Sequence, residues 1–246
     1  MRVISLNNMP LVSEDDDLTE LILTATENQG ISIRDGDVLV IAQSVVSKSE
    51  GNIINLEGIK PSDRAKEIAG KIKKEPREVE VILQQAQEIL KLKHVLITQT
   101  KHGFICANSG VDSSNTEPGK VTILPEDPDE TANSIREKIR ELTGTETAII
   151  ISDSQGRPFR RGSVGLALGV AGMKPITSYQ GKPDLYEKKL RRTEVATADA
   201  LATVGSIVMG ESKEGTPAVI IRGFEYTQGE GSAQELLRPQ EKDLFR

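Results

Sequence analysis

The segment Thr147-Ala-Ile-Ile-Ile-Ser152 is the clearest buried strand of this chain. Its unbroken aliphatic run is typical of a strand that is covered on both faces of a sheet. Two further runs have the same character, Asp37–Gln43 (DVLVIAQ) and Pro217–Gly223 (PAVIIRG). Segments with helical periodicity lie between them. The sequence therefore predicts a mixed α/β (α+β) fold with flanking helices and a central sheet of roughly five to eight strands.

Helices are predicted where apolar residues recur at helical spacing and end signals flank them. Ser62 or Asp63 is expected to cap one helix, acidic residues are expected at the front of the helix that begins at Asp17, and Gly144 and Gly210 are expected to end helices. Additional strands are predicted at Arg2–Leu6, His94–Thr100 and Gly103–Ala107. The predicted helices are Asp17–Asn28, Asp63–Lys73, Pro76 to about Leu90, Thr131–Leu142, Pro183–Met209 and Ala233–Phe245. No low-complexity linker divides the chain, which predicts a single unit over residues 1–246.

Composition excludes several classes of protein. The net charge is −6 and the pI is about 5.2, so no global basic field favours nucleic acid. One cysteine and two histidines exclude an internal disulfide and a metal centre built from cysteine or several histidines. The N-terminus shows no signal peptide, and no apolar run is long enough to span a bilayer. We expect a cytoplasmic protein with no nucleic-acid or membrane partner.

Small polar residues follow a predicted strand in Asn108-Ser-Gly-Val-Asp-Ser-Ser-Asn115. Hard divalent cations prefer oxygen ligands with little bulk, and Asp112 supplies the charge. The alternative is a capped turn, in which Asp and Asn side chains bond to their own backbone. Composition alone leaves both interpretations open.

A second polar segment, Ser152-Asp-Ser-Gln-Gly-Arg-Pro-Phe-Arg-Arg-Gly162, follows the strand quoted first. A carboxylate at the end of a buried strand, here Asp153 with Ser154 beside it, is a common Mg²⁺ ligand in phosphoryl-transfer sites. Arg157, Arg160 and Arg161 are suited to bind phosphate or carboxylate groups of a substrate. The alternative is a solvated basic loop in which Asp153 caps a helix.

Two more segments carry candidate groups. The glycine-bracketed loop Met209–Thr216 offers backbone N–H groups to phosphates, and Glu211 could complete a metal site. A predicted strand runs into a polar turn at Ser44–Gly51, where Lys48 could reach a phosphate. For both segments the alternative is a surface turn with solvated charges. Neither a P-loop nor a G-x-G-x-x-G pattern occurs, so a nucleotide site here is of an uncommon type.

Together these segments resemble the coenzyme F420-0:gamma-glutamyl ligase family, often called CofE, in order and over essentially the whole chain. Met9-Pro-Leu-Val12 with Asp15-Asp-Asp-Leu18 is similar to the family's N-terminal nucleotide loop. DGDVLVIAQSVVSKSEG is similar to its strand and Ser-Lys signature. NSGVDSSN and IISDSQGRPFRRG resemble its two metal-carboxylate motifs, and MGESKEGTPAVIIRG resembles its last nucleotide and metal loop. Ser154 stands where members often have threonine, which keeps the hydroxyl.

The resemblance implies a GTP-dependent ligase. Such an enzyme joins L-glutamate to the terminal carboxylate of coenzyme F420-0 through an acyl phosphate and then extends a γ-linked glutamate tail. It implies two divalent cations, Mn²⁺ or Mg²⁺, held by Asp112, Asp153, Ser154 and Glu211, with the three carboxylates catalytic through the metal. K⁺ is a further candidate ion. The implied contacts to GTP are Met9, Pro10, Leu11, Val12, Gln43, Ser44, Lys48, Asn115, Met209, Gly210, Ser212, Gly215 and Thr216. We assign the three arginines to substrate anions by their charge.

The resemblance also implies a CofE-like fold with mixed sheets, two interlocked subdomains and an intertwined homodimer. Two other functions remain open at this point. One is a different metal- and nucleotide-dependent ligase that joins another carboxylate to an amine. The other is a non-catalytic module that binds GTP and releases no phosphate.

Overall fold

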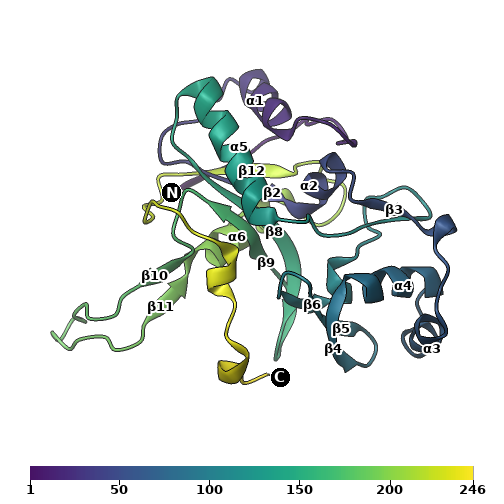
Figure 1. The fold of residues 1–246 in the computed structure, drawn as a ribbon. Coiled ribbons are helices and arrows are strands. Elements are labelled where there is room, and N and C mark those ends of the chain that lie inside the picture. The colour runs from purple at the N-terminus through teal and green to yellow at the C-terminus, as the bar shows by residue number, and fades with distance from the viewer. Residues whose placement is uncertain (246) are drawn as a thin grey trace.

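The computed structural model describes residues 1–245 and is organised around one five-stranded sheet (Figure 1). The pairing of β2 with β8 is parallel, and the other three pairings in this sheet are antiparallel. This confirms the predicted mixed α/β class. In sheet order the strands are β1 (Arg2–Ser5), β12 (Ala218–Arg222), β2 (Val38–Ala42), β8 (Ala148–Arg157) and β9 (Arg160–Ala171).

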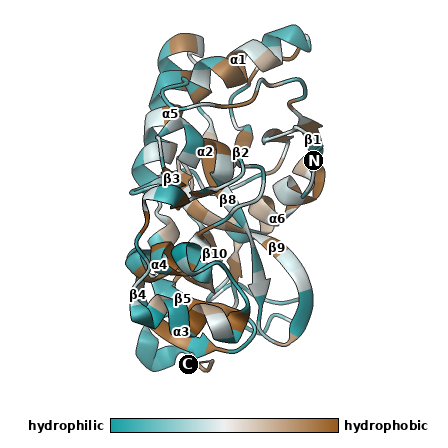
Figure 2. Cartoon of the chain, turned by 90° about the vertical axis from the view of Figure 1, so that its right-hand side faces the viewer, coloured by the Kyte–Doolittle hydropathy of each residue, from teal (hydrophilic) through white to brown (hydrophobic). Residues whose placement is uncertain are grey.

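Helices cover both faces of this sheet. Helices α1 (Leu18–Asn28) and α5 (Pro128–Thr143) lie on one face and α6 (Thr197–Met209) lies on the other. Ile149 and Ile151 of β8 pack in the core beneath α1 and α5, whereas Ile150 packs in the core beneath α6. Each such side chain contributes about 1.5–3 kcal/mol by burial. Two-sided burial explains why β8 is aliphatic at successive positions, and the outward faces of helices such as α5 are hydrophilic (Figure 2).

A second lobe with its own core is inserted between β2 and β8. It contains a three-stranded sheet, a two-stranded sheet and two helices, which pack around Ile68, Ile82 and Val121. Helix α2 (Gln43–Ser49) leads from β2 into it. Its other elements are β3 (Ile53–Asn55), α3 (Asp63–Ile72), α4 (Pro76–Gln85), β4 (Ala86–Leu92), β5 (Leu96–Thr100), β6 (Ile105–Ala107) and β7 (Lys120–Thr122), with 3₁₀ turns η1 (Leu56–Gly58) and η2 (Asn108–Gly110).

A long hairpin, which we call the arm (residues 176–196), projects from the body (Figure 1). Its strands β10 (Ile176–Ser178) and β11 (Glu194–Ala196) are short, and the loop between them is largely exposed. Leu185 and Tyr186 in that loop are 99% and 91% exposed. The described chain ends in two 3₁₀ turns, η3 (Ala233–Leu236) and η4 (Gln240–Lys242).

Predicted helix ends are confirmed at Ser62, one of the two expected caps of α3, and at Gly144 and Gly210. Asp17 and Ser62 cap α1 and α3, each accepting a hydrogen bond at 3.2 Å from the backbone N–H three residues later. Gly144 and Gly210 end α5 and α6 with φ of 73° and 78°. These positive φ values are conformations that glycine adopts without a steric penalty.

Three predicted helices were wrong in extent. Segment 183–196 belongs to the arm, because its run of charged residues offers no apolar face to bury, and α6 begins only at Thr197. Helix α4 ends at Gln85, after which residues 86–92 form a strand that pairs with β5. The C-terminal segment forms two 3₁₀ turns, since Pro239 cannot continue a helix.

Two acidic side chains connect distant parts of the fold. Asp37 is 2% exposed and receives a bidentate pair from Arg222, Nε at 2.8 Å and Nη2 at 2.6 Å. Asp129 at the start of α5 accepts hydrogen bonds from the backbone N–H groups of Val170 and Ala233 at 2.8 and 2.9 Å. It also accepts one from the Ser232 hydroxyl at 2.6 Å. The C-terminal segment is thereby attached to β9 and α5.

Within residues 1–245, no helix is sufficiently long and apolar to cross a bilayer.

Candidate functional site

The parallel pairing of β2 and β8 places two strand ends side by side, with Ala42 opposite Ser152. At that edge β2 turns directly into α2, so Lys48 lies on a helix and not in the polar turn that the sequence predicted. Strand β8 does not end at Ser152 either. It continues through Asp153 to Arg157 and pairs with β9, so the predicted basic loop is a hairpin and Asp153 caps no helix.

Asp153 is a half-buried residue inside β8. Its oxygens accept hydrogen bonds from the backbone N–H of Ser154 at 2.9 Å and from the Gln155 amide at 3.1 Å. Burial raises the pKa of Asp153 to about 6, an effect that those two hydrogen bonds oppose and the neighbouring carboxylates of Asp112 and Glu211 reinforce. A half-buried anion that faces two others is an unfavourable arrangement unless a cation binds there.

Asp112 lies in the second lobe, after a strained turn. Asn108, Ser109 and Gly110 all have positive φ, between 54° and 71°. The backbone of Asp112 then bridges to Thr122, with hydrogen bonds of 3.1 and 2.8 Å. Its Oδ1 accepts from the Ser114 backbone N–H at 2.9 Å and from the Ser114 hydroxyl at 2.8 Å, which fixes the carboxylate in place.

Glu211 follows α6 in the glycine-bracketed loop. Gly210 makes the turn with φ of 78°, and a side chain there would collide with Glu214, which itself accepts from the Ser212 backbone N–H at 2.8 Å. The Ser154 hydroxyl donates to Glu211 Oε1 across the site. Residues from β8 and from the loop after α6 are therefore in direct contact.

Helix α2 supplies the cation of this region. The Lys48 ammonium donates to the Asn115 carbonyl oxygen at 2.6 Å. Burial lowers the pKa of Lys48, and the nearby Asp112 carboxylate opposes that shift. Gln43 is held differently, because its amide nitrogen donates to the Ser47 hydroxyl at 2.5 Å and to the Ile123 carbonyl at 3.4 Å.

These segments surround one cavity of about 650 Å³. Its lining includes each predicted metal ligand and each predicted GTP contact: Asp112, Asp153, Ser154 and Glu211, with Met9, Pro10, Leu11, Val12, Gln43, Ser44, Lys48, Asn115, Met209, Gly210, Ser212, Gly215 and Thr216. Arg157, Arg160 and Arg161 are not among the lining residues and lie further along the β8–β9 hairpin. The convergence places these residues together, and their roles stay predictions.

The donor set fits a hard divalent cation in chemical type. Carboxylate and hydroxyl oxygens are the ligands that Mg²⁺ and Mn²⁺ prefer. Among the described residues no lysine or arginine forms an ion pair with Asp112, Asp153 or Glu211, although the Lys48 ammonium is near enough to interact with Asp112. A bound cation would offset the remaining negative charge. No three acidic, histidine or cysteine side chains of residues 1–245 are close enough to form a preassembled ligand cluster. The carboxylates would therefore have to approach one another when an ion binds.

Sequence reasoning missed three polar residues of the site. Gln155 orients Asp153, Ser114 orients Asp112, and Lys213 lines the cavity as a second cation. Gln155 was detectable in principle, since residues two apart on a strand share a face. The other two gave no signal apart from their position within polar loops.

The chain is similar over most of its length to proteins of one known family. The sequence profile of the family described as F420-0:Gamma-glutamyl ligase matches residues 7–223. The protein named Coenzyme F420:L-glutamate ligase from Methanothermobacter thermautotrophicus is 49% identical over 99% of this chain and 98% of its own length. Proteins of the same name are 51% identical in Methanocaldococcus jannaschii, covering 87% of this chain and 86% of that protein, and 42% identical in Archaeoglobus fulgidus, covering 100% and 96%.

Proposed function

The chain belongs to the F420-0:gamma-glutamyl ligase family, and on that premise we propose that it joins L-glutamate to coenzyme F420-0 at the expense of GTP. The observation that carries the proposal is that Asp112, Asp153 and Glu211, from three distant segments, line one cavity together with Lys48. That arrangement suits a triphosphate with bound divalent ions. The enzyme class, a ligase, agrees with the names of its relatives.

The nucleotide would occupy the 650 Å³ cavity. Lys48 provides a positive charge, and the loop 209–216 provides backbone N–H groups of the kind that bind phosphates. The N-terminal segment Met9–Val12 closes another side of the cavity, and Leu11 there is 95% exposed. This exposure leaves an apolar surface available to a purine base.

Asp112, Asp153, Ser154 and Glu211 are the groups that would hold two divalent ions, with Mn²⁺ and Mg²⁺ as the candidates and K⁺ as a further one. When bound, such ions offset the repulsion between an attacking carboxylate and a triphosphate. The chain's own contribution is to fix the ligands. Ser114 and Gln155 orient two of the carboxylates, and the contact from Ser154 to Glu211 joins the two sides of the cavity.

We propose that the reaction has two steps. The terminal carboxylate of F420-0 attacks the γ-phosphorus of GTP, which forms an acyl phosphate and releases GDP. The deprotonated α-amine of glutamate then attacks the acyl carbon, which forms the amide and releases inorganic phosphate. Repetition on the new γ-carboxylate extends a γ-linked tail. Arg157, Arg160 and Arg161 are placed outside the cavity, where they can bind anionic parts of the acceptor.

A homodimer is part of the same proposal. The arm has no core of its own, and a two-stranded hairpin is marginally stable in water unless something packs on it. A second copy of the chain would provide that packing. Sedimentation of the purified protein measures the association state directly.

The function is tested by incubating the purified chain with GTP, Mn²⁺, L-glutamate and F420-0 and measuring the mass of the coenzyme. We expect mass increments of one or more glutamate residues and one GDP for each amide formed. GTP binding without phosphate release would indicate a non-catalytic module. Amide formation on another carboxylate, with F420-0 left unchanged, would indicate a different ligase.

A further inference from the structure

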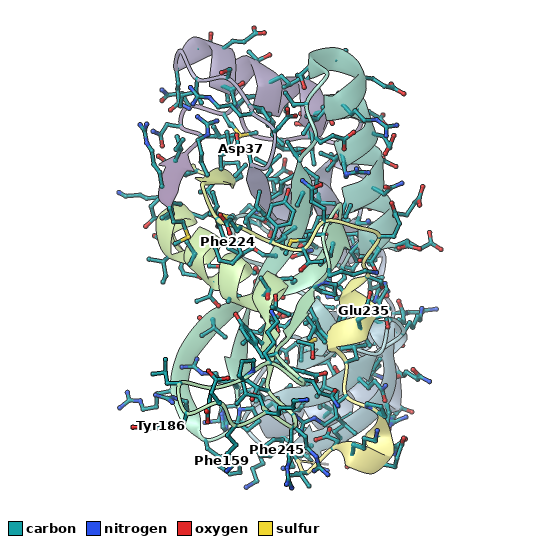
Figure 3. The ribbon with its side chains drawn as sticks, turned by 90° about the vertical axis from the view of Figure 1, so that its left-hand side faces the viewer. Asp37, Phe159, Tyr186, Phe224, Glu235 and Phe245 are labelled. Carbon is teal, nitrogen blue, oxygen red and sulfur yellow. The ribbon has the colours of Figure 1, made fainter. Side chains whose placement is uncertain are left out.

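The turn of the β8–β9 hairpin carries an exposed aromatic pair. Phe159 is 91% exposed, and its ring centroid lies 5.4 Å from that of Phe245 with a tilt of 58°. Figure 3 shows both side chains at the same end of the molecule. The chain has only four phenylalanines, so half of them lie at this one exposed place. A phenylalanine has no polar group to satisfy in water, which makes such exposure costly without a partner.

This turn is attached to the catalytic cavity by a continuous strand. Asp153 and Gln155 are two residues apart on β8 and share one face, and β8 continues past an irregularity in the pairing at Gly156 to Arg157, which pairs with Arg160. At about 3.3 Å per residue, Arg157 lies about 13 Å from Asp153 along the strand. The strand that carries the Asp153 carboxylate thus leads outward to the aromatic turn.

Three arginines accompany the phenylalanine. None of Arg157, Arg160 and Arg161 forms an ion pair with any residue in the described part of the chain. The Arg157 Nη1 donates to the Gly162 carbonyl at 3.0 Å, which braces its guanidinium across the turn. Guanidinium planes stack on aromatic rings and bind anions through their N–H groups. The turn therefore combines π surface and positive charge in a chain of net charge −6.

We propose that this turn, Phe159 with Arg157 and Arg160, binds the aromatic ring system of a deazaflavin acceptor while the acceptor's carboxylate reaches the cavity. This inference rests on the proposed function, which names the acceptor. In such a coenzyme the ring and the terminal carboxylate are separated by a sugar-alcohol and phosphodiester linker of roughly ten single bonds, about 12–13 Å when extended. That length matches the distance along β8 from Asp153 to Arg157, the last residue of the strand before the turn.

The arm provides the matched comparison for a test. Tyr186 is 91% exposed, like Phe159, and also lies at a basic hairpin end, but its hairpin is not continuous with the site (Figures 1 and 3). Two probes are titrated into each variant and followed by deazaflavin fluorescence anisotropy: F420-0 and the deazaflavin riboside, which lacks phosphate and carboxylate. The chain has no tryptophan, so protein emission is low.

We expect Phe159→Ala to weaken binding of both probes at least about fivefold, as loss of an aromatic stacking partner does. We expect Phe159→Tyr to bind within twofold of the wild type. Tyr186→Ala should leave both affinities unchanged, and all three variants should bind GTP as the wild type does. A preserved far-ultraviolet circular dichroism spectrum and unfolding midpoint would confirm that the variants are folded.

The inference would be overturned by equal riboside affinity in the wild type and Phe159→Ala, or by an equal loss in Tyr186→Ala. It would also be overturned if Phe159→Ala changed the sedimentation coefficient and left probe affinity intact, since Phe159 would then be a subunit contact. The proposed ligase function can be contradicted independently of this inference. A wild type that binds the riboside through Phe159 but adds no glutamate to F420-0 supports the turn as a ring site and contradicts the ligase proposal.

Discussion

The β8–β9 hairpin and the arm both leave the body of the molecule, and both end in exposed aromatic and basic residues. They differ in how they are anchored. Strands β8 and β9 are ten and twelve residues long and begin deep in the main sheet, whereas β10 and β11 are three residues long and pair only with each other. One hairpin extends the core, and the other has no core beneath it.

The difference indicates what each hairpin can do without a partner. The β8–β9 hairpin holds its turn at a fixed distance from Asp153, because every residue between them is in the paired ribbon. The arm is held by fewer contacts, because its two strands pair only with each other and its loop is largely exposed. We therefore propose substrate contacts for the first hairpin and subunit contacts for the second. Four substitutions test this assignment, in order of decreasing effect.

The largest effect is expected from Asp153→Asn. Removing one main charge-stabilising group of a transition state typically costs about 3 kcal/mol, so turnover should fall by at least about 100-fold. The measurement is the rate of glutamate addition with GTP and Mn²⁺ at saturation. The control is Asp184→Asn in the arm, where the carboxylate only accepts hydrogen bonds from the backbone N–H groups of Tyr186 and Lys188. Near-native turnover of Asp153→Asn would contradict the metal assignment.

Gly165→Ala is expected to loosen the anchoring of the β8–β9 hairpin. A methyl group at Gly165 would overlap the carbonyl of Ala202 in α6, and overpacking of this kind costs about 1–3 kcal/mol. The free energy of unfolding, measured with denaturant, should fall by that amount. Gly156→Ala in the same hairpin meets no atom within 4 Å and should change it by less than about 0.5 kcal/mol. Equal effects would show that the contact with α6 does not hold the hairpin.

Arg160→Ala is expected to act on substrate affinity alone. Loss of an exposed guanidinium that binds an anion should raise the KM for F420-0 by about five- to tenfold. The affinity for Mn²⁺, measured by calorimetry, should stay within twofold. Arg192→Ala in the arm is the control and should leave both quantities unchanged. If Mn²⁺ affinity fell instead, Arg160 would act through the metal site.

The smallest effect concerns Asp199, which connects the two hairpins. It lies just after the arm, at the start of α6, and accepts from the Ala167 backbone N–H of β9 at 2.9 Å. Burial raises the pKa of Asp199, partly opposed by that hydrogen bond. The folded protein therefore holds this proton more tightly than the unfolded chain does. Its contribution to stability is most favourable below the unfolded pKa and is lost as pH rises through the folded pKa.

Asp199→Asn should remove this dependence. Between the unfolded and folded pKa values, the stability of the variant relative to the wild type should rise with pH, by about 1.4 kcal/mol for each unit that separates the two values. The measurement is the unfolding free energy at several acidic pH values. A difference that stays constant with pH would show that Asp199 has the same pKa in both states.

The parts of the fold that sequence predicted well are those where local signals and burial agree. The aliphatic runs became β2, β8 and β12, and Ser62, one of the two expected caps, caps α3. Prediction failed where local propensity met a tertiary requirement. Residues 86–92 directly follow helix α4 and were predicted in part to continue it. They form a strand instead, because their pairing with β5 completes the three-stranded sheet of the second lobe. Residues 183–196 have no apolar face for a helix to bury.

The candidate site was also predicted only in part from the sequence. Sequence motifs identified residues that line one cavity, because small polar groups after aliphatic runs are unusual enough to notice. They could not reveal which strand ends are adjacent, since that depends on the parallel pairing of β2 with β8. They also placed Asp153 at a strand end, whereas it lies inside a strand that continues for four more residues.

That parallel pairing also affects how the molecule assembles. The whole second lobe lies in the chain between Ala42 and Ser152, so the contact closes one of the longest loops in the protein. Long loops close slowly and at an entropic cost, which makes late formation of the β2–β8 pair the expected course of folding. A chain still emerging from the ribosome would then have no complete pocket for a nucleotide until the loop that follows α6 is synthesised. A ligand would then bind only to the completely folded chain, and this binding would shift the folding equilibrium towards the folded state.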